Sequence, residues 1–299
     1  MLNILITGGT GLVGQRVMAH LLSKGYKVGI LSRQVVKINN VRSFLWDNKQ
    51  LDLEALRFAD VIVHLAGVNV GSKRWSKKRK ELIISSRVST AELIRSSLIE
   101  NNISIDSFIS ASAIGYYGEG GDKKLIESDS TITPDFLSEV CHKWEDQTAL
   151  FSSICRTASV RIGFVIDKKA DGFNKLVQPI KLGFGSGLGS GKQFMSWIDL
   201  HDLANVFIYV IENKKMEGPV NACSPEAITN NELSAQTAKF FKKPYFMPNV
   251  PKVALRLLLG EMANLALVGN RVYPQKLIDS GFEFEYPSFQ KTLEHIYSK

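Results

Sequence analysis

The sequence predicts an α/β protein with a doubly wound parallel sheet and a smaller, discontinuous C-terminal region. Strand-like and helix-like segments alternate through the first half of the 299 residues, which is typical of βαβ units. A glycine-rich turn separates the first strand from the first helix. From about residue 167 the alternation stops and glycines become frequent. Together these observations favour a Rossmann-type domain joined to a region of different construction.

The strands and helices of the first 166 residues are expected in a simple order. Each strand is a short run of apolar residues, and each helix has apolar residues at helical spacing. The expected strands are 2–8, 27–33, 60–67, 106–115 and 155–166, and the expected helices are 12–25, 52–59, 77–102 and 135–151. A short irregular piece is expected between residues 33 and 52.

The second half of the chain contains fewer regular signals. Residues 182–193 hold five glycines in twelve positions, which indicates a loop. A short strand leading into a helix is expected over 194–213, a further strand over 218–225, and helical segments without further βαβ alternation over 226–299. We therefore predict a Rossmann-type domain of residues 1–166 plus 195–225, and a substrate-side region of residues 167–194 plus 226–299.

Composition and cysteine content indicate a soluble protein of a reduced cytoplasm. Hydrophobic residues make up 44% of the chain and charged residues 22%, and no signal peptide is expected. Residues 252–269 are strongly apolar, but Arg256 and Glu261 interrupt them, so we expect a core helix rather than a membrane span. Cys141, Cys155 and Cys223 form no CxxC pair, which predicts neither a disulfide framework nor a metal site.

Part of the net charge of +8 lies in one basic run, KRWSKKRK, at residues 73–80. Such a run indicates either the solvated start of a helix or a patch for nucleic acid. No helix-turn-helix, zinc-finger or aromatic RNA-binding motif accompanies it. A solvated helix start is therefore the favoured interpretation, and no nucleic-acid partner is expected.

The glycine-rich turn is TGGTGLVG, at residues 7–14. Gly8, Gly11 and Gly14 have the spacing at which glycine allows a tight turn, close approach of a pyrophosphate, and packing of helix on strand. The amides at the start of the following helix then face the negative charge of the phosphates. The sequence therefore predicts a dinucleotide site that includes Thr10, Leu12 and Val13 as well as the three glycines.

The end of the second strand, LSRQ, favours NADP over NAD. NAD sites usually place an acid at this point to bind the ribose 2′-hydroxyl, whereas this chain has Ser32 and Arg33. A guanidinium can bind the 2′-phosphate of NADP with charge-assisted hydrogen bonds. NADP (NADPH) is therefore the expected cofactor, with NAD binding less well, and a surface arginine without this role is the alternative.

Two further segments are expected beside the dinucleotide. Trp46 and Asp47 lie within the irregular piece and are predicted to lie near the adenine. The sequence HLAG ends the strand at 60–67, so the backbone of Leu65, Ala66 and Gly67 is expected to run beside the cofactor.

Several phrases together resemble one known family. The phrases are TGGTGLVG, HLAG, SASAIGYYG, VRIGFVI, SWIDLHDL and RWSKKRKELIISSRVSTAEL, with a C-terminal match from LGEMANLALVG onward. This combination resembles the extended short-chain dehydrogenase/reductase superfamily over nearly the whole chain. More narrowly, it is similar to the atypical "epimerase family" subgroup, which is related to NAD-dependent epimerases/dehydratases, carries a C-terminal domain of unknown function and has no assigned substrate.

The resemblance implies catalysis by a Ser, a Tyr and a Lys, of which only the Ser has a clear match. Ser112 matches the Ser, with Ser110 less well placed. Alignment of DFLSEVCHKWE puts Leu137 at the Tyr position and Cys141 at the Lys position, and no Tyr in the chain has a Lys four residues later. The family's proton relay, in which the Lys lowers the pKa of the Tyr, is therefore missing.

Substitute groups are expected among the neighbouring residues. Tyr117, or Tyr116 beside it, could replace the family Tyr, but packing in the turn after the strand is the alternative for Tyr117. Cys141 could take part in the chemistry or be a small buried hydrophobe, and His142 could take part or lie on the surface. We predict Ser112, Tyr117 and Cys141 as catalytic candidates.

Other residues could line the site from the substrate side. Arg87 on the long helix is predicted to contact the cofactor. A larger group is expected either to contact a second ligand or to brace the structure; it consists of Arg161, Lys192, Gln193, Trp197, Asp199 and Asp202. For the two aspartates, the start of a helix is the alternative location, because carboxylates stabilise helix N-termini.

Three interpretations of function remain. In the first, the chain is a cytoplasmic NADP-dependent oxidoreductase or epimerase-like enzyme acting on an unknown small molecule, such as a sugar nucleotide or another carbonyl or hydroxyl compound. In the second, it is a non-catalytic NADP(H) sensor or interaction protein, and in the third it binds nucleic acid through residues 73–80. The first is favoured, with a monomer or homodimer expected and no membrane partner.

Overall fold

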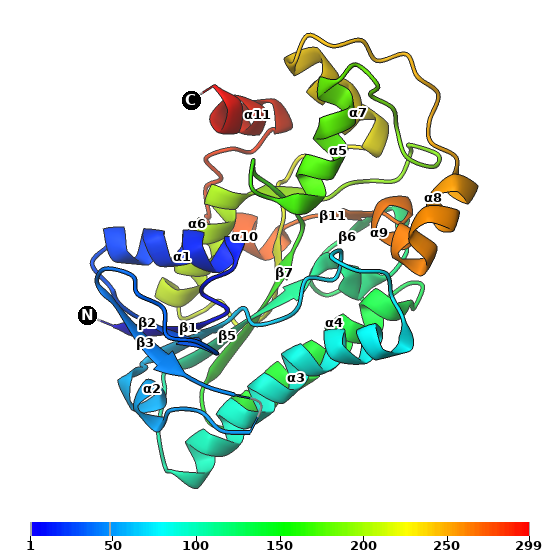
Figure 1. Cartoon of the computed structure of the whole chain (residues 1–299). Coiled ribbons are helices and arrows are strands. Elements are labelled where there is room, and N and C mark those ends of the chain that lie inside the picture. The colour runs from blue at the N-terminus through cyan, green and yellow to red at the C-terminus, as the bar shows by residue number, and fades with distance from the viewer. Residues whose placement is uncertain (1, 48, 299) are drawn as a thin grey trace.

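The computed structural model describes residues 2–47 and 49–298. Its centre is a seven-stranded parallel sheet in the order β10-β7-β5-β4-β1-β2-β3 (Figure 1). The strands are β1 (Asn3–Thr7), β2 (Lys27–Ser32), β3 (Val41–Leu45), β4 (Val61–His64), β5 (Ser107–Ala113), β7 (Arg156–Ile162) and β10 (Gly218–Ala222). The order reverses between β1 and β4, and the predicted doubly wound sheet is confirmed.

Helices cover both faces of the sheet (Figure 1). On one face α1 (Leu12–Ser23) packs beside α6 (Leu200–Glu212), and their apolar side chains share a core with β1, β2, β4 and β5. The other face carries α2 (Leu53–Phe58), α3 (Lys77–Glu100) and α4 (Phe136–Ala149). The central strands are apolar on both sides, as a sheet covered by helices on each face requires.

The remaining elements form a region beside the carboxyl ends of the strands. Its strands pair in two small parallel sheets: β6 (Gly121–Leu125) with β11 (Asn270–Val272), and β8 (Phe164–Ile166) with β9 (Trp197–Asp199). Its α-helices are α5 (Asp171–Lys181), α7 (Asn230–Phe240), α8 (Lys252–Leu259), α9 (Asn264–Leu267), α10 (Gln275–Asp279) and α11 (Phe289–Tyr297). The short 3₁₀ helices η1 (Ile114–Tyr117) and η3 (Gly260–Ala263) also belong here, whereas η2 (Leu150–Ser153) connects α4 to the start of β7. An apolar cluster centred on Phe173, Trp197 and Phe289 stabilises this region.

The structure differs from the expected elements at several points. The irregular piece contains β3, the tail contains β11, and β6 follows η1. The strand expected at 155–166 is divided into β7 and β8 at Gly163, where a side chain would lie 2.8 Å from the Ser196 carbonyl oxygen. The expected helix at 252–269 is divided into α8, η3 and α9. Among the described residues no helix combines the length and hydropathy needed to cross a membrane.

The division into two domains stays a prediction. Strand β10 joins the main sheet, as expected for residues 195–225. Leu277 and Phe282, from the tail assigned to the substrate-side region, pack in the core of the main sheet. The tail therefore contributes to both regions.

Candidate cofactor and catalytic sites

The glycine turn connects β1 to α1 where the strand order reverses. Gly8 has a φ of +70°, and its carbonyl oxygen accepts the Gly11 amide at 3.0 Å. A Cβ atom on Gly14 would lie 2.5 Å from the same carbonyl oxygen. At Gly11 the nearest atom would be 3.3 Å away. The turn therefore needs glycine at 8 and 14 for its own packing, whereas Gly11 lies at the surface.

Helix α1 begins without a cap. Gly11 is its N-cap residue, no side chain of residues 2–47 and 49–298 caps the first turn, and the first turn holds no acid. The first amides of a helix have no partner inside the helix, so those of Leu12 and Val13 are free to bind an anion beside Gly11. Thr10 is exposed beside them. This arrangement fits a pyrophosphate group.

Strand β2 brings Ser32 and Arg33 next to the glycine turn. Leu31 pairs with Thr7 at the end of β1, so Ser32 and the exposed Arg33 lie one strand away from the turn. The Ser32 hydroxyl donates to the carbonyl oxygen of Gln34. The amide of Trp46 donates to the Ser32 carbonyl oxygen at 3.1 Å. This bond holds Trp46, which is half-buried, beside Ser32.

Asp47, predicted with Trp46 to lie near the adenine, bonds to its own loop. Its exposed carboxylate accepts the amides of Lys49 at 2.7 Å and Gln50 at 2.9 Å. These amides lower the pKa of Asp47. The side chain closes its own turn, which favours a local structural role over contact with a ligand.

The end of β4 lies directly against the glycine turn. A Cβ atom on Gly8 would be 2.8 Å from the carbonyl carbon of Leu65 and 2.9 Å from the amide nitrogen of Ala66. The Ala66 amide donates to the Thr7 hydroxyl at 3.2 Å. Residues 65–67 thus lie against the glycine turn, and their contact with a cofactor stays a prediction. We call residues 8–14, 32–33 and 65–67 the glycine-turn edge.

The buried His64 braces the glycine-turn edge through contacts with Thr7 and Arg87. Nδ1 of His64 lies 2.8 Å from the Thr7 hydroxyl, and Nε2 lies 3.3 Å from the Arg87 carbonyl oxygen. Since the carbonyl can only accept, Nε2 carries the proton and Nδ1 accepts from Thr7. Burial lowers the pKa of His64 to about 4. His64 is therefore a neutral brace between β1, β4 and α3.

Arg87 is a buried cation beside the glycine-turn edge. It donates to the carbonyl oxygens of Ile83 at 2.8 Å and Val68 at 3.2 Å, and it stacks on Trp144 at 4.7 Å. A Cβ atom on Gly67 would lie 2.9 Å from its guanidinium carbon. Burial lowers the pKa of Arg87 to about 10, and its Nε has no hydrogen-bond partner among the described residues. Arg87 braces the segment after β4, and its unpartnered Nε fits the predicted cofactor contact.

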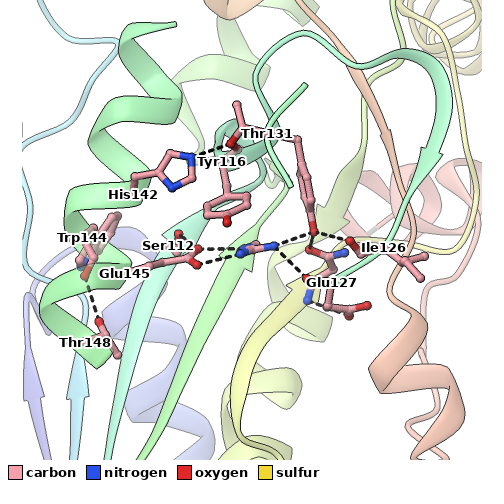
Figure 2. A network of polar contacts seen from close by, with 12 residues as sticks. Ser112, Tyr116, Ile126, Glu127, Thr131, His142, Trp144, Glu145 and Thr148 are labelled. Carbon is pink, nitrogen blue, oxygen red and sulfur yellow. Dashed lines mark hydrogen bonds and ion pairs between the residues drawn. The ribbon is translucent and has the colours of Figure 1, made fainter. Parts of the chain in front are cut away.

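At the end of β5, where the resemblance places the catalytic Ser, the structure shows a closed hydrogen-bond network (Figure 2). Ser112 is buried and its hydroxyl donates to Glu145 at 2.6 Å. Nε and Nη2 of Arg161 donate to the two oxygens of the same carboxylate, each at 2.8 Å. Nη1 of Arg161 donates to the Tyr117 hydroxyl at 2.9 Å. We call Ser112, Glu145, Arg161 and Tyr117, with Asn221, the Ser112 network.

Tyr117 lies inside this network. Its side chain is fully buried, and its hydroxyl oxygen lies 2.8 Å from Oδ1 of Asn221 and 3.0 Å from the Ile126 carbonyl oxygen. Burial raises the pKa of Tyr117 to about 12. Such a hydroxyl keeps its proton near neutral pH. The geometry therefore favours the packing alternative over the predicted catalytic role.

Cys141 also lies in a position unfavourable for proton transfer. It is buried, and burial together with the charge of Glu145 raises the pKa of its thiol to about 12. Leu137, one helical turn earlier, packs against Gly115. His142 is half-buried, bonds to Thr131 at 2.5 Å and packs on Tyr116, so the expected surface location is only partly correct (Figure 2).

The other substrate-side candidates act as braces in the structure. Arg161 forms the buried ion pair with Glu145. Asp199 caps α6, and its other oxygen lies 3.0 Å from His295. Asp202 accepts the amides of Glu285 and Tyr286, at 3.0 and 2.9 Å, and burial raises its pKa to about 6.

Gln193, Lys192, Trp197 and the basic run have separate locations. Gln193 donates to the carbonyl oxygens of Leu188 and Ala266, whereas Lys192 is exposed and Trp197 lies in the core. The run at 73–80 includes the start of α3 at Lys77, as expected of a helix start, but its last residue, Lys80, pairs with Glu261.

The sequence reasoning missed Glu145 and Asn221 as members of the network, and His64 as a brace. For Glu145 a signal existed, because Leu137, Cys141 and Glu145 are spaced by four residues and share one face of α4. No local signal identified Asn221, which is 104 residues away from Tyr117 along the chain. In the described part of the chain no cluster of His, Cys, Asp or Glu is arranged to hold a metal.

The parallel sheet, its strand order and the uncapped glycine turn define a Rossmann-type α/β protein. The chain belongs to the NAD dependent epimerase/dehydratase family, whose pattern matches residues 4–158. Residues 250–296 match a domain of unknown function, DUF1731. Both halves of the resemblance seen in the sequence are therefore confirmed.

Relatives with this architecture come from bacteria and animals. The chain is 32% identical to the epimerase family protein YfhF of Bacillus subtilis over 299 residues, covering 99% of this chain and 98% of that protein. It is 28% identical to the mouse epimerase family protein SDR39U1, covering 99% of each.

Solved structures resemble the fold over its whole length. The human epimerase family protein SDR39U1, crystallised with NADPH, superposes with a TM-score of 0.88 at 24% identity and covers 100% of both chains. A nucleoside-diphosphate sugar epimerase from Corynebacterium glutamicum is 30% identical with a TM-score of 0.78, covering 99% of this chain and 58% of that one.

Proposed function

We propose that this protein binds NADP(H) at the glycine-turn edge. The observation that carries the proposal is the uncapped start of α1 with the exposed Arg33 on the neighbouring strand. Free amides and a guanidinium at this spacing suit the pyrophosphate and the 2′-phosphate of one dinucleotide. The presence of NADPH in the human relative's structure supports the same choice of cofactor.

Each part of the edge would hold a different part of the cofactor. The amides of Leu12 and Val13 would bind the pyrophosphate beside Gly11, and Ser32 with Arg33 would bind the 2′-phosphate. Trp46, held beside Ser32, would contact the adenine. The backbone of 65–67, supported by Arg87 and His64, would run beside the rest of the dinucleotide. When bound, the nicotinamide supplies or accepts a hydride.

We further propose an oxidoreductase or epimerase-like reaction on a carbonyl or hydroxyl group of a small molecule. Membership of the epimerase/dehydratase family supports this class of chemistry. The reaction would run without the family's Tyr and Lys, whose positions hold Leu137 and Cys141. A sugar nucleotide is one substrate class to test, because the Corynebacterium relative is described as a nucleoside-diphosphate sugar epimerase.

A second candidate function is NADP(H) binding without turnover. The burial of Ser112, Tyr117 and Cys141 favours it. The Ser112 proton points to Glu145, and the raised pKa values of Tyr117 and Cys141 hold their protons in place. A sensor or interaction protein needs the glycine-turn edge but needs no proton relay.

The deciding experiment is calorimetric titration of cofactor-stripped protein with NADPH, NADP, NADH and NAD. NADPH absorbance is then followed with a panel of carbonyl compounds and nucleotide sugars. Preferential NADP(H) binding with saturable oxidation supports the enzyme, and preferential binding without oxidation supports the sensor. Absence of binding to all four dinucleotides would contradict the whole proposal.

A further inference from the structure

The outer margin of the C-terminal region carries an unusual group of exposed apolar side chains. Leu255 is the one residue of helix α8 that is buried. The exposed fraction is 69% for Val253, 75% for Leu257 and 71% for Leu258. Monomeric proteins seldom expose several large apolar side chains in one place without a partner. This helix therefore presents an apolar face that a bound surface would cover.

The exposed apolar surface continues onto the two segments next to α8. Phe246 and Leu182 are exposed by 75% and 71%, and Phe184 by 65%. The segments containing them run side by side, because Val250 donates to the Gly187 carbonyl oxygen and Gly189 donates to the Val250 carbonyl oxygen. In Figure 1 the chain between α7 and α8 follows the outer edge of the molecule.

The charged residues of the segment between Glu232 and Glu261 have one sign. Between Glu232 and Glu261 the chain contains no Asp or Glu. In the same interval it contains five cations, all exposed: Lys239, Lys242, Lys243, Lys252 and Arg256. On α8 itself, Lys252 and Arg256 lie one turn apart beside the exposed leucines. Exposed aliphatic residues and cations thus share one surface.

We propose that this basic apolar margin, formed by residues 239–258 with Leu182 and Phe184, binds the surface of an anionic lipid bilayer. Leucine and phenylalanine side chains can enter the boundary between headgroups and acyl chains, while lysine and arginine contact the anionic headgroups. A short helix lying on the bilayer requires no segment that spans it.

The charge pattern distinguishes the bilayer from other occupants. A second copy of the chain would place one group of five cations near the identical group, so the interface would contain like charges. A nucleic acid would match the cations but would leave the exposed Val253, Leu257 and Leu258 without apolar partners. An anionic bilayer complements both the cations and the apolar side chains.

The test is cosedimentation of the full chain with large vesicles. One set contains phosphatidylcholine alone and the other contains equal parts of phosphatidylcholine and phosphatidylglycerol. We expect binding only to the mixed vesicles, with the bound fraction falling as salt is raised. Failure to bind the mixed vesicles at low salt would overturn the proposal.

Two pairs of variants separate the margin from the general positive charge. Leu257→Glu with Leu258→Glu, and separately Lys243→Glu with Lys252→Glu, should each lower the ratio of bound to free protein about tenfold or more. The matched controls are Ile99→Glu with Leu150→Glu, and Lys214→Glu with Lys215→Glu, which change exposed residues elsewhere. Equal losses in the controls would overturn the proposal.

Two further readouts complete the design. The margin variants should keep the unfolding temperature and dinucleotide binding of the unchanged chain, because the margin is separate from the glycine-turn edge. Sedimentation velocity without lipid should show the same mass for all variants. A dimer that Leu257→Glu with Leu258→Glu dissociates would show that a second copy covers the margin, and this would overturn the bilayer proposal.

Discussion

The glycine-turn edge and the Ser112 network differ in how their polar groups are satisfied. At the glycine-turn edge the first amides of α1 have no side-chain cap, and Arg33 is exposed. In the Ser112 network, Ser112, Arg161, Tyr117 and Glu145 bond to one another with distances between 2.6 and 2.9 Å. One region leaves donors available to a ligand, and the other uses its donors internally.

This difference indicates that the Ser112 network is complete without a ligand, whereas the glycine-turn edge is not. Buried polar groups are costly unless they are paired, so a closed network satisfies its own members without needing a substrate. Free donors at a helix start become fully effective only when an anion binds. The two regions therefore do not compete for the same donors, and a dinucleotide at the glycine-turn edge would not require the Ser112 network to open.

The largest effect is expected from Arg161→Met. It removes the cation from a buried ion pair and leaves Glu145 without its partner, which should lower the free energy of unfolding by about 3 to 5 kcal/mol. Urea denaturation measures this change. The double variant with Glu145→Met is the control and should recover much of the loss, because no unpaired charge remains. A single-variant loss below about 1 kcal/mol would show that Glu145 does not depend on Arg161 as its buried partner.

Arg33→Asp tests the other side of the comparison. Loss of a charge-assisted contact to the 2′-phosphate should weaken NADP binding about 10- to 100-fold, and NAD binding should change by less than about threefold. Calorimetric titration measures both. Lys27→Asp, at the opposite end of β2, makes the same change in net charge and should affect neither dinucleotide. Equal losses of NADP and NAD affinity in Arg33→Asp would refute the 2′-phosphate contact.

These two regions also differ in how far the sequence could predict them. The glycine turn is local, since its three glycines, the flanking strand and the helix occupy consecutive residues. The Ser112 network joins residues from β5, η1, α4, β7 and β10. Arg161 and Glu145 are 16 residues apart, and Tyr117 and Asn221 are 104 apart. The spacing on α4 points to Glu145, but no local pattern identifies its partner Arg161 or the contact of Tyr117 with Asn221.

The missed strands have a similar physical reason. Strand β3 lies at the edge of the sheet and buries only Phe44, and β6 buries only Leu125. Strand prediction depends on apolar residues that alternate or occur in runs, and a strand with one buried side chain gives neither signal. Its location is set by the neighbouring strand rather than by its own composition.

The pH dependence of stability tests whether His64 fixes the glycine-turn edge as a neutral group. Its pKa is about 4 in the folded chain against an ordinary value of 6.5, so the unfolded chain binds its proton more tightly. Stability should therefore be lost as pH falls from 6.5 towards 4, by about 2 kcal/mol at pH 5. Urea denaturation at pH 7.5 and pH 5 should show this loss in the unchanged chain and a smaller loss in His64→Asn.

The comparison with His64→Asn is needed because Asp202 has the opposite effect. Its raised pKa of about 6 makes the folded chain gain stability as pH falls in the same range. This contribution is common to both proteins and cancels in their difference. An identical pH dependence in the two proteins would mean that His64 is charged or accessible in the folded chain.

The smallest effect is expected from Ser112→Ala. This variant tests whether the Ser112 network contributes to dinucleotide affinity at the glycine-turn edge. The variant removes one hydrogen bond to Glu145, which keeps its bidentate contact with Arg161, so unfolding should become easier by only about 1 kcal/mol. NADP(H) affinity should stay within about twofold, because the Ser112 hydroxyl is directed at Glu145. Ser110→Ala, two residues earlier on β5, is the matched control. A tenfold or greater loss of affinity in Ser112→Ala alone would show that the network opens towards the cofactor, and the family's serine would then still belong to the ligand site.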